Sequence, residues 1–330
     1  MLNYSIIIPH RDIPKLLQRC LDSIPQRPDL EVIVVDDNSN PEVVDFDHFP
    51  GKERQDTTII FDKSGKGAGR ARNIGLEHAK GKWLLFADAD DFFNYCLNDV
   101  LDEYVDNDSD IIFFKASSVD SQSYLIADRT DWYNYQVKEY ENTPMTSDMF
   151  LRYVAGIPTA KLVRHEIVTK WDIHFQETKI HNDTKFSYLT GYYAKKIAVD
   201  QRAVYCLTYR PDSISYTLTD EKIIDRTKVL AERERFYLDH EIPCVFKYMD
   251  FVIDTLIQVR EQGKNLLFDK CLEIFSEFGF SREMMLGMIS KELQRRQKLE
   301  KQKTVNEWIV RANNAIGLPF RIIIYRLAGI

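Results

Sequence analysis

Three aspartates follow a short apolar run in the stretch of residues 82–93. Residues 83–87 are mostly large and apolar, which is typical of a strand buried on both faces of a sheet. Because side chains alternate along an extended chain, Asp88 and Asp90 project to the same side of that strand's end. Two such carboxylates are hard oxygen ligands that suit Mg²⁺ or Mn²⁺, with other positions left for water and phosphate. Acids that cap a following helix would give the same pattern.

Two further polar pairs occur at predicted element ends. Asp36 and Asp37 directly follow a second buried strand, at the edge where open α/β sheets bind ligands. Asn182 and Asp183 precede a predicted helix, so either residue could be its N-cap. Capping by one residue of the pair leaves the other able to face a cleft.

Strands alternate with helices along the first part of the chain, which predicts a parallel-rich α/β sheet. Runs of apolar and β-branched residues predict strands at 4–9, 30–35, 57–61, 83–87, 110–114 and 159–163, with two short strands in 197–209. Apolar spacing predicts helices at 16–24, with Asp12 as a cap, and at 70–79, 147–153, 164–170 and 184–192. Residues 116–145 lack clean periodicity and are interpreted as a loop or hairpin insertion. Helical signals at 223–240, 246–262, 266–278 and 281–303 predict a C-terminal helical extension.

Composition places the chain among globular proteins, with 44% apolar and 29% charged residues over 330 positions. The five cysteines are scattered, which favours reduced thiols and a cytoplasmic setting over a disulfide frame or zinc site. We expect neither a signal peptide nor a membrane span, since no basic-then-apolar leader and no apolar run of 18 residues occurs.

Charge is unevenly distributed, with a net charge of −7 overall. From Ser290 onward there are nine Lys or Arg and three Glu, so this tail is basic and the remainder is strongly acidic. An acidic body argues against nucleic-acid binding. Arginines flank the apolar run Ile322–Tyr325, which is too short to span a bilayer but could lie in a membrane interface. A docked terminal helix or strand explains the run equally well.

The glycine-rich stretch Gly65–Gly69 fits neither common nucleotide motif. No Gly-Lys-Ser/Thr follows at the spacing of a phosphate-binding loop, and the third position of a dinucleotide fingerprint is Arg72. The remaining interpretation is a flexible loop that opens a helix whose basic residues face a ligand. Arg70 points well away from Arg72 on that helix, and we expect it to be solvated.

Four motifs occur in one order: a first strand ending in Pro9, then residues 34–39, 71–75 and 86–91. Together they resemble the family 2 glycosyltransferases, strongly over residues 4–95 and more loosely over 145–215. The resemblance implies a GT-A fold with a mixed, mostly parallel sheet flanked by helices. It also implies an inverting, metal-dependent enzyme that uses a nucleotide sugar.

The resemblance implies a nucleoside pocket lined by Pro9 and the Asp36–Asp37 pair. One carboxylate of the pair would accept hydrogen bonds from the base and the ribose. Arg72 is expected beside the nucleotide. One departure is His10 with Arg11 after the first strand, where an aromatic residue and Asn are usual, so the side chain that shapes the base-binding edge is left open.

The same resemblance implies that Asp88 lies near the ribose and donor sugar, and that Asp90 holds Mn²⁺ or Mg²⁺ on the diphosphate. Asp183 matches the catalytic base of the family. Asn182 stands where many members carry Glu, a departure that preserves the aspartate. A positioned carboxylate is what a weakly nucleophilic acceptor hydroxyl requires for deprotonation.

The expected function is transfer of a sugar from a nucleoside-diphosphate sugar, UDP by family frequency, to a hydroxyl of a saccharide or lipid-linked saccharide acceptor. Bacterial surface-polysaccharide assembly is the expected setting, in the cytoplasm or at the inner membrane face through the basic tail. Residues 1–215 would form the GT-A domain, with a nucleotide-sugar half at 1–115 and an acceptor half at 116–215. Residues 216–330 would form the helical extension.

Two alternative functions predict different features of the sequence. A sugar nucleotidyltransferase would share the sheet and metal, but should carry a glycine-rich, arginine-containing loop after the first strand, where Pro9–Arg11 stands. A catalytically silent binding module would not need Asp88, Asp90 and Asp183 together.

Overall fold

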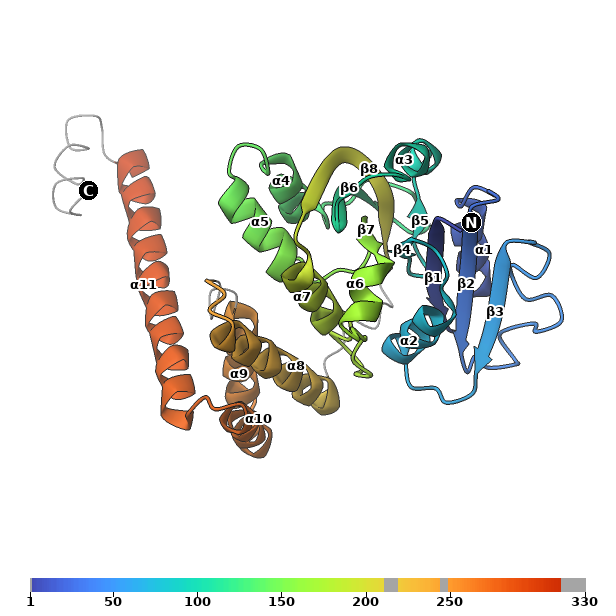
Figure 1. The fold of residues 1–330 in the computed structure, drawn as a ribbon. Coiled ribbons are helices and arrows are strands. Elements are labelled where there is room, and N and C mark those ends of the chain that lie inside the picture. Colours follow the sequence, from blue (N-terminus) through green and yellow to red (C-terminus); the bar gives the residue numbers. More distant parts are fainter. Residues whose placement is uncertain (1, 211–218, 244–248, 316–330) are drawn as a thin grey trace. The chain divides into compact units, whose positions relative to one another are not determined.

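The computed structural model describes residues 2–210, 219–243 and 249–315 (Figure 1). The chain separates into two compact units, Met1–Tyr248 and Met249–Ile330. The first unit contains the sheet and every predicted site residue. It also contains α8 (Asp220–Asp239), which the sequence assigns to the extension. The predicted domain boundary after residue 215 stays a prediction.

The first unit is built on a mixed eight-stranded sheet of order β3-β2-β1-β4-β7-β6-β8-β5. Its strands are β1 Tyr4–His10, β2 Leu30–Asp37, β3 Thr57–Asp62, β4 Trp83–Phe86, β5 Phe92–Phe93, β6 Ile111–Asp120, β7 Lys161–Arg164 and β8 Ile197–Tyr209. The first four strands run parallel, β7 runs antiparallel to its neighbours β4 and β6, and β6 pairs with β8 in parallel. The predicted mixed α/β sheet is thereby confirmed.

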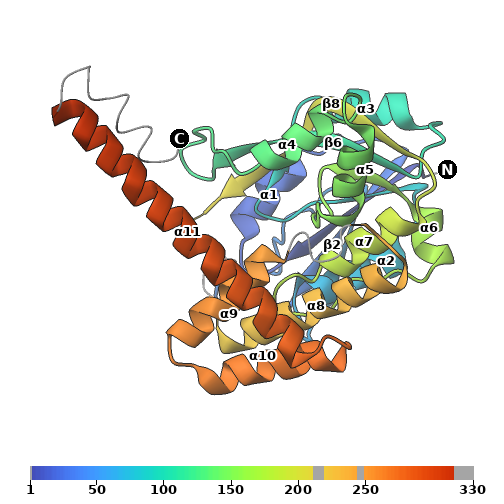
Figure 2. The same ribbon diagram turned by 90° about the vertical axis from the view of Figure 1, so that its left-hand side faces the viewer.

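Helices cover the sheet, and their order along the chain follows the predicted alternation. They are α1 Pro14–Asp22, α2 Ala68–His78, α3 Leu97–Tyr104, α4 Asp131–Lys138, α5 Pro144–Tyr153, α6 His165–Lys170 and α7 Thr184–Tyr193. α7 packs against α5 on one side and α8 on the other (Figures 1 and 2).

The strand register brings the candidate residues to one edge of the sheet. His10 pairs with Asp36 across β1 and β2, and Ile7 pairs with Phe86 across β1 and β4. Because these strands are parallel, their carboxyl ends and the residues that follow them meet at the same edge. This edge is where ligands of open α/β sheets bind.

Three local predictions are wrong. Residues 116–145 include the end of β6, all of α4 and the start of α5, where a loop or hairpin was predicted. α4 is short, so its two buried residues Tyr133 and Val137 give little periodicity. Tertiary hydrogen bonds hold it instead, because the Asn134 side chain bonds both the N–H and the carbonyl of Ala116.

Residues 197–209 form one strand and not two, because β8 continues through a register irregularity opposite Phe114 and Lys115. Asp12 does not cap α1, which begins at Pro14. Asp12 has a left-handed backbone with φ 56°, and its carboxylate accepts from the Asn40 N–H at 2.7 Å.

The second unit consists of α9 (Asp250–Glu261), α10 (Asn265–Glu277) and α11 (Arg282–Ala315) in its described part. Its buried core includes Leu256, Phe275 and Met285. No helix among the described residues is long and apolar enough to cross a membrane. The arginine-flanked run at 322–325 lies outside the described residues, and both its membrane contact and a cytoplasmic location stay predictions.

Gly75 allows α2 to lie directly on β1. A Cβ added at this position would sit 2.4 Å from Cγ2 of Ile7, inside van der Waals contact. We expect Gly75→Ala to lower the free energy of unfolding by about 1–3 kcal/mol, because the helix must move off the strand. Denaturant unfolding measures this change.

Gly287 in α11 is the matched control, because an added Cβ there meets nothing within 4 Å. Gly287→Ala should be neutral or stabilising, since alanine is the better helix former. Equal destabilisation by the two substitutions would contradict the close packing of α2 on β1.

Candidate active site

Asp36 is fully engaged inside the protein. Its carboxylate accepts from the His10 Nδ1–H at 2.8 Å, the Ser39 N–H at 3.0 Å and the Ser39 hydroxyl at 2.5 Å. The other His10 nitrogen, Nε2, accepts from the Ile13 N–H at 3.2 Å, so the ring proton is on Nδ1. Burial opposes ionisation of Asp36, but the hydrogen bonds from His10 and Ser39 outweigh it and lower its pKa. Asp36 therefore fixes the ends of β1 and β2.

Asp37 is less completely satisfied than its neighbour. Its Oδ2 accepts from the Gly67 N–H at 2.9 Å and lies 3.5 Å from Nη1 of Arg11. Its Oδ1 is buried and has no hydrogen-bond partner in the described part of the chain. Burial raises the pKa of Asp37. Of the predicted nucleoside-binding pair, Asp37 is the one with an acceptor available, and Pro9 is buried nearby in β1 opposite Val35.

Arg72 on α2 joins two separate segments of the predicted site. Its Nη2 donates to Oδ1 of Asp88 at 2.5 Å, and its Nη1 donates to Oδ1 of Asn182 at 2.7 Å. The guanidinium also lies 5.4 Å from the centroid of the Phe175 ring. The Arg72 side chain is only 6% exposed, whereas the Asp88 side chain is 40% exposed, so a buried cation contacts a partly exposed carboxylate.

The segment that carries Asn182 and Asp183 is held against α2 by a residue that was not singled out in the sequence. Asn73 Nδ2 donates to the Phe175 carbonyl at 2.9 Å, and its Oδ1 accepts from the Phe175 N–H at 2.8 Å. A Cβ at Gly69 would lie 2.0 Å from the Gln176 carbonyl oxygen, so only glycine permits this approach. The signal was present in the motif 71–75, where Asn73 follows Arg72.

β8 holds the three aspartates that follow β4. The Tyr205 hydroxyl accepts from the Asp88 N–H at 2.8 Å and donates to Oδ2 of Asp91 at 2.9 Å. The Thr208 N–H donates to Oδ1 of Asp91 at 2.7 Å, and the Thr208 hydroxyl donates to the Asp90 carbonyl at 2.6 Å. Burial, with the charges of Asp88 and Asp90, raises the pKa of Asp91 well above its usual range. Asp91 is thus an internal support for the other two.

Asp88 and Asp90 lie at the surface of this edge, with side chains 40% and 23% exposed. Oδ2 of Asp90 accepts from Nε and Nη2 of Arg210 at 3.0 and 2.7 Å. Burial and the charge of Asp88 raise the pKa of Asp90, against the opposing effect of Arg210. Each carboxylate keeps one oxygen, Asp88 Oδ2 and Asp90 Oδ1, that accepts no hydrogen bond from another described residue.

The described residues contain no group of three or more His, Cys, Asp or Glu side chains that could hold a metal ion. One or two carboxylates are nevertheless what Mg²⁺ takes when substrate phosphates supply further oxygens. The two remaining carboxylate oxygens therefore fit a divalent cation shared with a bound diphosphate. Their hard oxygen chemistry suits Mg²⁺ or Mn²⁺.

Asp183 occupies the N-cap position of α7, but its side chain makes no capping hydrogen bond. Its carboxylate makes no hydrogen bond or ion pair with another residue in the part of the chain that the structure describes. Burial raises its pKa, while the positive charges of Arg72 and Lys161 act in the opposite direction. His181, two residues before Asp183, has φ 56°, a strained conformation of the kind that clusters at functional sites. Capping does not account for Asp183.

Glu177, a second carboxylate near Asp183 in the sequence, is engaged at the surface. It lies 3.5 Å from Arg70 and 3.7 Å from Lys66. The expectation that Arg70 is only solvated is wrong, because Arg70 also lies 4.0 Å from Asp62.

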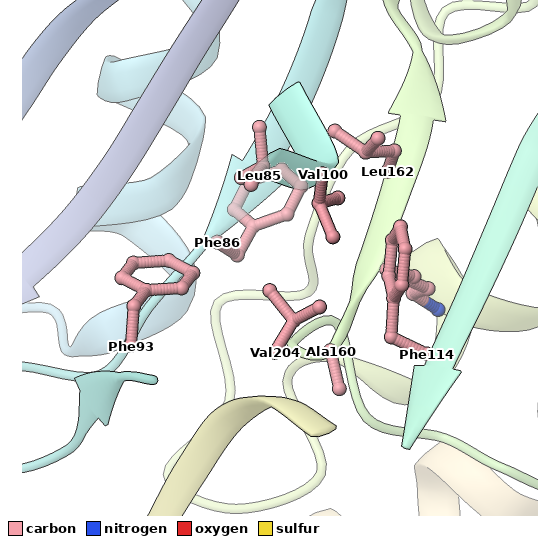
Figure 3. A pocket seen from close by; sticks show the side chains of 9 residues that line it. Leu85, Phe86, Phe93, Val100, Phe114, Ala160, Leu162 and Val204 are labelled. Atoms are coloured by element: carbon pink, nitrogen blue, oxygen red, sulfur yellow. The ribbon is translucent and has the colours of Figure 1, made fainter. Parts of the chain in front are cut away.

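A void inside the first unit measures about 10 Å³ and is lined mainly by apolar side chains, including Phe86, Phe93, Phe114 and Val204 (Figure 3). That volume is about enough for one water molecule. It is a gap in the core and not a sugar-binding pocket.

The sequence model of glycosyl transferase family 2 matches residues 5–172, which are just over half of the chain. The chain belongs to glycosyl transferase family 2. This confirms the predicted family.

Among curated proteins, this family 2 chain is 26% identical over 218 residues to the poly(ribitol-phosphate) beta-N-acetylglucosaminyltransferase TarS of Staphylococcus aureus. That match covers 64% of this chain and 36% of TarS, so the chain spans about a third of the length of this relative. It is 23% identical over 225 residues to the glycosyltransferase GlyG of Streptococcus pneumoniae, covering 66% of this chain and 74% of GlyG.

Solved structures of Staphylococcus aureus TarS share the fold of this family 2 chain. TarS 1-349 in complex with UDP-GlcNAc gives a TM-score of 0.56 at 22% identity, covering 71% of this chain and 66% of that one. TarS 1-349 in complex with UDP gives a TM-score of 0.53 at 18% identity, and the match covers 90% of this chain and 92% of that one. The predicted GT-A-type fold is confirmed.

The fold of this family 2 chain brings Arg72, Asp88 and Asn182 into direct contact, with Asp183 within electrostatic reach of the first two. Asp36 and Asp37 are the last two residues of β2, and Asp37 accepts a hydrogen bond from the N–H of Gly67, the residue before α2. The roles predicted for these residues stay predictions.

Asn73 offers a test of how the segment that carries Asp183 is held. Asn73→Ala should destabilise the family 2 unit by about 1–3 kcal/mol, because the N–H and carbonyl of Phe175 lose their partners in a buried place. Hydrogen exchange should show faster exchange at the Phe175 amide. A matched surface control is Asn142→Ala, because the Asn142 side chain is exposed and donates to the Glu139 carboxylate. Unchanged hydrogen-exchange protection of the Phe175 amide would contradict the view that the Asn73 side chain holds the Phe175 backbone.

Proposed function

We propose that this family 2 chain is an inverting glycosyltransferase that moves a sugar from a nucleoside-diphosphate sugar to an acceptor hydroxyl. The observation that carries the proposal is the arrangement around Arg72. This buried cation contacts Asp88, a predicted donor-binding residue, and Asn182. Asn182 precedes Asp183, whose side chain neither caps α7 nor pairs with another described residue. Arg72 thereby connects the proposed donor-binding residue Asp88 to the segment that carries the proposed base.

The donor is proposed to be a UDP-sugar. The structures of TarS in complex with UDP-GlcNAc and with UDP support this choice for a chain that shares the fold. Asp37 supplies a buried acceptor, Oδ1, that can take a hydrogen bond from the base or ribose. Asp36 acts through its neighbours, because all its contacts are internal, and Pro9 forms part of the same wall.

The diphosphate leaving group must have its developing charge neutralised. Asp90 and Asp88 are proposed to hold Mn²⁺ or Mg²⁺ through the oxygens that the protein leaves unused. When bound, such an ion stabilises charge on the departing diphosphate. Arg72 and Arg210, held against Asp88 and Asp90, keep the repulsion between the clustered carboxylates small.

Asp183 is proposed to take the proton from the acceptor hydroxyl as that oxygen attacks the anomeric carbon. A carboxylate whose pKa is raised by burial is a stronger base than an exposed one, provided that it stays ionised. Attack on the face opposite the diphosphate inverts the anomeric centre and requires no enzyme nucleophile.

The acceptor is proposed to be a saccharide or lipid-linked saccharide of a bacterial surface polymer. This rests on the family and on the similarity to TarS, which is named a poly(ribitol-phosphate) beta-N-acetylglucosaminyltransferase. Donor hydrolysis across a nucleotide-sugar panel tests the function without knowledge of the acceptor. No hydrolysis of any donor, with no nucleotide bound, would favour a catalytically silent module.

The metal assignment is tested by Asp90→Asn. We expect the variant to bind UDP no better with Mn²⁺ than without it, because one of two proposed metal-binding carboxylates is lost. Calorimetry of UDP binding, with and without Mn²⁺, measures this difference. Asp99→Asn, an exposed change on α3, is the control and should keep the parental response. The same metal-dependent gain in Asp90→Asn and the parent would refute the assignment.

The base assignment is tested by Asp183→Asn. Asparagine caps helices about as well as aspartate, so the change keeps the helix start intact. Loss of the proton acceptor should slow donor hydrolysis and transfer on the order of 10²–10⁴-fold. UDP binding should survive, because the proposed nucleotide contacts lie elsewhere.

Glu177→Gln is the matched control, since Glu177 pairs with Arg70 and Lys66 at the surface. It should keep near-parental turnover. Near-parental turnover in Asp183→Asn would move the base role to another residue, and lost UDP binding would place Asp183 in the nucleotide pocket instead.

A further inference from the structure

Lys161 is a buried lysine that no part of the proposed reaction uses. It is the first residue of β7 and is only 4% exposed. Its neighbours Ala160 and Leu162 line the core void together with Phe114 (Figure 3), so the lysine stem starts among apolar side chains. An ammonium group in such surroundings is costly unless it is compensated by an opposite charge or hydrogen bonds.

The ammonium of Lys161 lies beneath the first turn of α7. Its Nζ is 3.5 Å from the Ser187 hydroxyl oxygen, and no carboxylate forms an ion pair with it in the described part of the chain. Ser187 is one helical turn after Asp183, and its N–H donates to the Asp183 carbonyl at 3.0 Å. Residues four apart share a helix face, so Lys161 approaches the face that Asp183 begins.

The backbone around Lys161 is held in a strained form. Ala160 has φ 55°, a conformation that residues with a Cβ rarely adopt, and its carbonyl accepts from the Phe114 N–H at 3.0 Å. Such strain persists only where the surrounding structure imposes it, and it is common next to functional groups. It directly precedes the lysine.

The two opposite charges act on each other. Burial lowers the pKa of Lys161 to about 7, and the charge of Asp183 opposes that shift. Burial raises the pKa of Asp183, and Lys161 opposes that shift in turn. The other charged groups that act on Asp183 are Arg72 from α2 and Asp88 after β4. Arg72 is already bonded to Asp88 and Asn182, so Lys161 is the cation without another carboxylate contact.

We propose that Lys161 is a positioning residue for Asp183, whose ionised form its buried ammonium stabilises from beneath α7. The inference rests on the proposed role of Asp183 as the base. In the reaction, the acceptor O–H bond breaks and its proton goes to the Asp183 carboxylate. The acceptor oxygen forms the bond to the anomeric carbon, while the bond from that carbon to the diphosphate oxygen breaks and its electron pair leaves with the nucleoside diphosphate. Lys161 keeps its own proton throughout.

Lys161→Met tests the inference, because it removes the charge and keeps an unbranched apolar stem. Without the positive charge, the Asp183 carboxyl should hold its proton to higher pH. The acid limb of the kcat/KM profile for donor hydrolysis should then move upward by on the order of one pH unit or more. Lys161→Arg, which keeps the charge, should leave the limb at the parental pH.

A purely structural role for Lys161 predicts a different result. Lys161→Met would then lower kcat/KM by the same factor at every pH and leave the acid limb in place, which would overturn the inference. Absence of donor hydrolysis in the parent would instead count against the proposed function, and the stability measurements below still test the charge coupling.

A double-mutant cycle of Lys161→Met and Asp183→Asn provides the readout that does not depend on activity. Chemical unfolding at pH 6, where Lys161 is charged, should give a favourable coupling between the two residues. At pH 9, above the pKa of about 7, the coupling should disappear. Equal coupling at both pH values, or none at either, overturns the inference.

If Lys161→Met does not fold, the stability of the Asp183→Asn variant at the two pH values tests the inference by itself. In that variant the buried ammonium loses its anion, so the substitution should destabilise the protein more at pH 6 than at pH 9. The reverse dependence, or no dependence on pH, overturns the inference.

Discussion

The buried Arg72 guanidinium is the interaction on which the geometry of the site depends. It has one partner after β4, Asp88, and one on the segment before α7, Asn182, separated by 94 residues of chain. Removing Arg72 would take the ion-pair partner from the Asp88 carboxylate and the hydrogen-bond donor from the Asn182 amide oxygen at the same time. The fold supports the arginine from below, because Gly75 lets α2 approach β1 and Asn73 clamps the Phe175 backbone. Fixing α2 therefore fixes both sides of the site.

The carboxylates at this edge are distinguished by their partners and not by their type. The Asp36 and Asp91 carboxylates accept hydrogen bonds from within the protein, and they hold neighbouring strands and turns in place. Asp37, Asp88 and Asp90 keep oxygens that the protein does not use. Asp183 keeps its whole carboxylate unbonded to other described residues. The number of carboxylate oxygens that remain free to bind a ligand differs among these aspartates. That difference is the physical basis for assigning different roles to similar side chains.

Burial raises the cost of charge throughout this region, and the protein offsets it with cations placed behind or beside each acid. Arg210 accompanies Asp90, Arg72 accompanies Asp88, and Lys161 acts on Asp183 from inside the core. α8 adds a second layer, because Glu232 bonds Gln176 and Lys185 on either side of the Asn182–Asp183 pair. Glu232, beyond position 215, thus holds the chain on both sides of the predicted base.

The sequence alone predicted most of the strands, the α/β alternation and the candidate residues Asp88, Asp90 and Asp183, because these predictions depend on local periodicity and on motif residues in order. It could not separate Asp36 from Asp37, find Asn73 or Lys161, or recognise α4, because each depends on partners far along the chain. The Asp183 side chain could have capped α7 by sequence, and only the folded segment shows that it does not. Local propensity chose the elements; long-range hydrogen bonds and burial decided which of their polar groups remained available.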